Sequence, residues 1–78
     1  MLRYVLLEEN KNNAIYEYFP EGKSQSGIIG ISKATGELNI IRLAETDRHR
    51  TYAAKLFRKL EEFQKKQLYN EKGMIAWY

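Results

Sequence analysis

A single stretch of helical periodicity stands among segments that are patterned as strands. Its apolar positions are Ala53, Leu56, Phe57, Leu60, Phe63 and Leu68. They recur every three or four residues, which is the spacing of one helix face. Thr46 or Asp47 can cap the free amides of a first turn, and Asn70 can end the helix in left-handed backbone. The sequence therefore predicts one amphipathic helix over residues 47–69.

Runs rich in aromatic and β-branched residues predict four strands before this helix and one after it. These runs cover residues 4–7, 14–19, 27–32, 37–43 and 74–78. A turn that closes with Gly36 joins the third and fourth strands as a hairpin. The element order is β-β-β-β-α-β, so we expect an α+β fold in one small domain, residues 1–78. Its sheet should be mainly antiparallel, with the helix packed on one face.

Apolar side chains occupy both faces of the expected sheet. Ile15 and Phe19 point one way, while Tyr16 and Tyr18 point the other. Five strands span roughly 24 Å, and one helix is about 10 Å wide, so the helix covers one face only in part. The second face must curl onto itself, stay exposed or meet another molecule. We predict self-association, with a dimer favoured, and a candidate interface that comprises Tyr16, Tyr18, Ile28 and Trp77.

The basic residues gather in the last part of the chain. Residues 1–47 contain five Lys/Arg and seven Asp/Glu, whereas residues 48–78 contain eight and three. The net charges are therefore −2 and +5. An asymmetry of this kind indicates either a solvated helix face or a surface that binds anions. If the surface binds nucleic acid, the candidate residues are Arg48, Arg50, Lys55, Arg58 and Lys59.

The residues needed for common enzyme chemistry are sparse. The chain has no cysteine and one histidine, His49, which excludes disulfides and thiolate sites. Glu45, Asp47 and His49 match no established metal-ligand spacing, and no serine lies in a triad pattern. We therefore expect no catalytic, cofactor or metal site. No apolar run reaches the ~20 residues of a membrane span, and the first residues do not read as a signal peptide, so we expect a cytoplasmic protein without a membrane partner.

Several segments resemble a group of very short proteins from Gram-positive bacteria and their phages or mobile elements. The matching segments are Tyr16–Gly22 (YEYFPEG), Thr35–Glu37 (TGE), Leu43–Asp47 (LAETD), Tyr52-Ala53 and Gly73–Tyr78 (GMIAWY). The resemblance covers roughly residues 14–78. That group has no assigned activity, so the resemblance implies a bacterial cytosolic setting and a mobile-element origin, and it transfers no site residue.

These observations favour a small, non-enzymatic protein-interaction module that self-associates. The same apolar surface could instead bind a different protein, whose identity the sequence does not give. The alternative function is a nucleic-acid-binding accessory protein that uses the basic face of the helix over residues 47–69.

Overall fold

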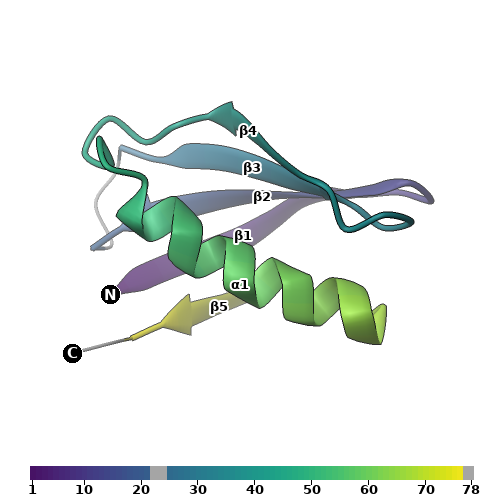
Figure 1. Ribbon diagram of the computed structural model, residues 1–78. Helices are drawn as coiled ribbons and strands as arrows, with labels where there is room; N and C mark the ends of the chain where they lie inside the picture. The colour runs from purple at the N-terminus through teal and green to yellow at the C-terminus, as the bar shows by residue number, and fades with distance from the viewer. Residues whose placement is uncertain (22–24, 77–78) are drawn as a thin grey trace.

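The computed structural model describes residues 1–21 and 25–76, and its elements follow the predicted order (Figure 1). The strands are β1 (Leu2–Glu9), β2 (Asn13–Pro20), β3 (Gly27–Ser32), β4 (Leu38–Arg42) and β5 (Lys72–Ile75), and the helix is α1 (Thr51–Lys66). All neighbouring strands are antiparallel. The predicted α+β fold, with a five-stranded antiparallel sheet and one helix packed against it, is confirmed.

The strand order is β4-β3-β2-β1-β5. The first four strands are neighbours in sequence order, because at most six residues separate each strand from the next. After β4 the chain crosses the sheet as α1 and returns as β5 on the far side of β1. The register places Tyr4 opposite Tyr18 and Tyr16 opposite Ile29, so these side chains share one face of the sheet.

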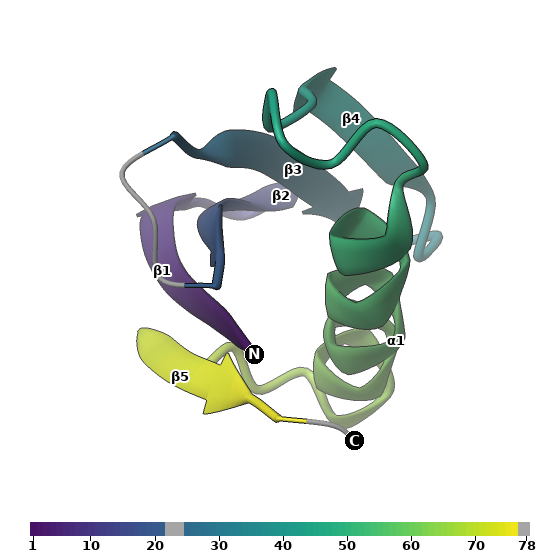
Figure 2. The same cartoon turned by 90° about the vertical axis from the view of Figure 1, so that its left-hand side faces the viewer.

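The sheet is strongly curled. Figure 2 shows the five strands arranged in an arc, with α1 lying across the open, concave side. Curling brings the two edge strands toward the helix, so one helix covers more of this face than it could on a flat sheet. In the part of the chain that the structure describes, no helix covers the convex face.

The core lies between the concave face and α1. Its buried residues are Leu2, Tyr4, Ala14, Tyr16, Tyr18, Ile29, Ile31, Ala44, Ala53, Leu56, Leu60, Phe63 and Tyr69. The Tyr16 ring lies 5.7 Å from Tyr4 and 6.0 Å from Phe63, measured between ring centroids. Burying a side chain such as Leu60 stabilises the fold by about 1.5–3 kcal/mol. The aromatic cluster therefore joins the helix to the two central strands.

The helix is shorter than predicted at both ends. It begins at Thr51 because the preceding residues form turns, with Arg50 in left-handed backbone at φ 59°. It ends after Lys66 because Gln67 is also left-handed, at φ 53°, and its amide donates to the carbonyls of Phe63 and Gln64. Leu68, predicted to lie on the buried helix face, is 65% exposed beyond the helix end. Among the described residues, no helix has the length and apolarity needed to cross a membrane.

The last strand starts earlier than predicted, at Lys72 rather than Met74. Gly73 permits this, because a Cβ at that position would overlap the ring of Tyr4, its partner across the ladder. Trp77 and Tyr78, which the prediction included in this strand, lie outside the described residues.

Candidate functional site

Two of the predicted interface residues are buried inside the protomer. Tyr16 and Tyr18 are both 0% exposed beneath α1. The Tyr16 hydroxyl donates to the carbonyl of Asn70 at 2.7 Å. The prediction that these tyrosines form an intermolecular surface is wrong, because the strand places their face toward the helix and both rings join the core.

The Tyr18 hydroxyl connects the sheet to the start of the helix. It donates to Oδ2 of Asp47 at 3.2 Å and accepts a hydrogen bond from the amide of Ala44 at 3.0 Å. Burial raises the pKa of Tyr18 to about 12, and the negative charge of Asp47 acts in the same direction. Burial also raises the pKa of Tyr16. Both phenols therefore keep their protons at neutral pH and act as structural hydrogen-bond donors.

Asp47 is the one charged residue among those described that is buried, at 2% exposed. Its Oδ1 accepts the amide of Tyr52 at 3.0 Å, and its Oδ2 accepts the amide of Ala53 at 2.9 Å. Asp47 therefore caps the amides of the first helical turn, as predicted, although the helix starts four residues later. Because this carboxylate already occupies the first-turn amides, they are not available to an external anion.

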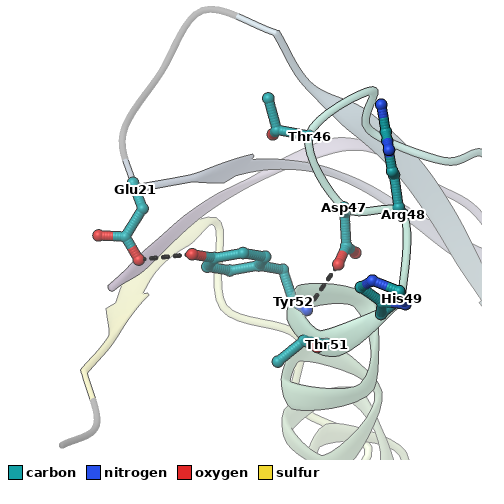
Figure 3. Close-up of a pocket in the computed structure, with 7 residues that line it drawn as sticks. All are labelled: Glu21, Thr46, Asp47, Arg48, His49, Thr51 and Tyr52. Carbon is teal, nitrogen blue, oxygen red and sulfur yellow. Dashed lines mark hydrogen bonds between the residues drawn. The ribbon is translucent and has the colours of Figure 1, made fainter.

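A shallow pocket lies beside this cap (Figure 3). Its lining residues are Glu21, Thr46, Asp47, Arg48, His49, Thr51 and Tyr52. The Tyr52 hydroxyl donates to Glu21 at 2.7 Å, which raises the pKa of Tyr52. Within the described residues, no group of three His, Cys, Asp or Glu side chains could hold a metal ion. The hydrogen bonds that the lining residues Asp47 and Tyr52 make here connect the start of α1 to the end of β2.

The predicted basic residues lie on and just before the helix. Arg48 and Arg50 are exposed in the turns that precede α1. Lys55, Arg58 and Lys59 lie on adjacent turns of the helix itself, and Lys59 forms an ion pair with Glu62 at 3.8 Å. The structure therefore gathers these five cations along the first half of α1 and its leading turn, on the side of the molecule opposite the convex sheet face.

The convex face of the sheet is the larger candidate surface. Its apolar side chains are Val5, Ile15, Phe19, Ile28, Ile41 and Met74, which alternate in register with the buried set. Ile41 is 51% exposed and Met74 57% exposed, while Ile28, which the sequence placed in the interface, is half-buried. We call this set the outer apolar surface. Of the three predicted interface residues that the structure describes, Ile28 lies on this surface and the two tyrosines do not; Trp77 lies outside the described residues.

Charged side chains are interspersed among these apolar groups. The Arg3 guanidinium lies 4.1 Å from the centre of the Phe19 ring. Arg42 donates to Ser26 Oγ at 2.8 Å and lies 3.9 Å from a carboxylate oxygen of Glu17. In these contacts the charged end of Arg3 lies over an aromatic ring and that of Arg42 meets polar side chains, so the face is both apolar and charged.

Local sequence patterns identify only part of the outer apolar surface. Alternation places Ile15 and Phe19 opposite the tyrosines but does not determine which face the helix covers. Gly30 and Ile41 are not among the predicted interface residues. A usable signal was present: Gly30 interrupts a run of isoleucines within a strand, and an interior glycine in a strand often marks close approach by another group.

Comparisons with known proteins do not assign this chain to a family. No family model matches it, and no match is found among curated proteins or solved structures. The resemblance to short Gram-positive and phage proteins therefore stays a prediction, and the functional argument depends on the geometry alone.

Proposed function

We propose that this protein is a small, non-enzymatic interaction module that self-associates through the convex face of its sheet. The observation that carries the proposal is the outer apolar surface, on which Ile41 and Met74 are each about half exposed. These two residues lie on the opposite edge strands β4 and β5, and the half-buried Val5, Ile15, Phe19 and Ile28 lie on the strands between them. Large exposed apolar patches are uncommon on proteins that act as monomers, and they usually mark interfaces.

The charges of this face favour a second copy as the partner. In the described residues it carries three basic side chains, Arg3, Arg42 and Lys72, and three acidic ones, Glu8, Glu17 and Glu37. A surface that meets its own copy brings like charges together if it has a net charge. The convex face is balanced, whereas the helix side carries the cluster of five cations. Repulsion between like charges should therefore oppose self-association less through the sheet face than through the helix side.

Sedimentation equilibrium at micromolar concentrations tests the proposal. We expect a dimer, and we expect Ile41→Lys to shift the equilibrium toward monomer. Leu68→Lys is a matched control, because Leu68 is 65% exposed but lies beyond the helix end rather than on this face. A wild-type protein that stays monomeric across the range, or an Ile41→Lys variant that associates as well as Leu68→Lys, would refute the proposal.

A second candidate function is binding of nucleic acid by the basic face of α1. The observation that favours it is the stretch from Arg48 to Lys59, which has five cations and no acidic residue. Immediately before it, Asp47 is buried and committed to the helix amides. The positive charge of this stretch is therefore not balanced within the stretch itself.

Salt dependence of binding to duplex DNA tests this second function. Each phosphate contact should contribute a slope of about −0.9 to the logarithm of the affinity against the logarithm of salt concentration. The double variant Arg58→Glu with Lys59→Glu should weaken binding and reduce that slope. The double variant Lys65→Glu with Lys66→Glu is the control, because it makes the same charge change at the other end of α1. No binding at low salt would eliminate this function.

A further inference from the structure

Gly30 differs from the other described glycines because neither its φ nor a steric overlap with its neighbours requires glycine at this position. A Cβ at Gly27 would overlap the ring of Tyr18, and one at Gly73 would overlap the ring of Tyr4. Gly36 has φ 78°, which side chains rarely adopt. At Gly30, in contrast, φ is outside the left-handed region, and a Cβ would meet Ile15 Cγ1 at 3.6 Å and Ile41 Cδ1 at 3.8 Å, which are ordinary contacts.

The absence of a side chain at Gly30 is costly to the strand. Glycine inside a strand destabilises a protein by roughly 0.5–1 kcal/mol relative to alanine. Because alanine fits at this position, packing within one protomer does not explain the glycine. Interior glycines in strands also occur where another backbone or ligand approaches closely. Gly30 lies at the bottom of a hollow on the convex face, bordered by Asn13, Ile15, Ser32, Asn39 and Ile41.

Ile41 projects beside this hollow because of a β-bulge. The pairing of β3 with β4 shifts between Ile28 and Ile29, whose partners are Arg42 and Ile40. Ile41 is therefore the extra residue of β4, and its side chain lies on the convex face near Gly30. Bulges at sheet edges redirect side chains and disfavour pairing of the edge with another strand. The bulge thus favours contact through the face rather than through the β4 edge.

We infer that Gly30 and Ile41 form the centre of a two-fold contact between two copies of this chain, in which Ile41 of each copy occupies the hollow over Gly30 of the other. The inference rests on the proposed self-association and specifies its geometry. In a two-fold contact one patch serves both copies, so the patch must contain both a projection and a hollow. Here the two are neighbours on adjacent strands, within a face of balanced charge.

Adding a side chain at Gly30, which would partly fill the hollow, tests this inference. Gly30→Ala should leave the stability of the monomer unchanged or higher, measured by urea unfolding at a concentration low enough to dissociate the wild type. The same substitution should raise the dissociation constant of the dimer, and Gly30→Val should raise it further, by about tenfold or more. Monomer stability is then kept or raised while dimer affinity falls. If Gly30 served only the fold of one chain, monomer stability would fall instead. Should Gly30→Val fail to fold, Gly30→Ala carries the test.

The outcomes separate this inference from the proposed function. A wild-type dimer that Gly30→Ala leaves equally tight or tightens would overturn the inference while self-association stands. Loss of monomer stability in Gly30→Ala would also overturn it, because the glycine would then serve the fold. A wild type that is monomeric at all concentrations would refute self-association and the inference together, and would leave the face for a different protein.

Discussion

Removing the Asp47 side chain should destabilise the protein more than any other single change near the helix start. This buried carboxylate accepts the amides of Tyr52 and Ala53 and the hydroxyl of Tyr18. It therefore holds together the helix, the preceding loop and the second strand. In Asp47→Ala all three donors lose this acceptor, and two of these hydrogen bonds, from the Tyr18 hydroxyl and the Ala53 amide, are buried.

The size of the effect follows from these contacts. Loss of a helix cap costs about 1 kcal/mol, and a buried donor left without a partner costs about 1–3 kcal/mol. For Asp47→Ala we expect the free energy of unfolding to fall by about 3–4 kcal/mol. A chain of 78 residues has a total stability of roughly 4–12 kcal/mol, so this is a large fraction. Asp47→Asn retains one acceptor oxygen and should lose about half as much.

Urea unfolding followed by circular dichroism measures the change, at one low protein concentration to avoid contributions from association. The slope against urea should not change, because the surface exposed on unfolding is the same. Glu45→Ala is the control, since it removes an exposed acidic side chain two residues away. If Asp47→Ala lies within about 0.5 kcal/mol of the wild type, as surface substitutions do, the carboxylate does not hold the helix start and the reasoning is wrong.

Three further predictions use the same urea measurement. Gly27→Ala should cost about 1–3 kcal/mol, because its Cβ would overlap the buried ring of Tyr18; a neutral result would mean that the ring can move aside. Leu60→Ala should cost about 2–5 kcal/mol because Leu60 is fully buried, while Leu68→Ala should stay within about 0.5 kcal/mol, and equal losses would contradict the observed helix end. The contribution of Tyr18 to stability should be constant at pH values well below 10 and should fall as pH rises from about 10 to about 12. In this window the unfolded chain loses the Tyr18 proton that the folded chain keeps, so Tyr18→Phe should show a smaller loss.

The order and type of the elements could be predicted from local patterns. The helix periodicity around Leu56 and Leu60, the aromatic strand that ends at Pro20 and the turn at Gly36 each depend on neighbouring residues alone. The helix ends were less predictable. Asp47 caps the helix across an intervening turn, because Arg50 adopts left-handed backbone, and nothing local requires that conformation.

Local sequence patterns could not predict which face of the sheet forms the candidate surface. Alternation along the second strand separates Tyr16 and Tyr18 from Ile15 and Phe19, but both sets are apolar, so the sequence alone determined the two faces without deciding which one is buried. The tertiary structure decided it. The tyrosine face is compatible with the core because its hydroxyls reach Asp47, before α1, and Asn70, after α1. Both residues are distant from the tyrosines in sequence and approach them only in the folded chain. A buried hydroxyl usually has such a partner, so the tyrosines of this strand face the core, and Ile15 and Phe19 lie on the convex side.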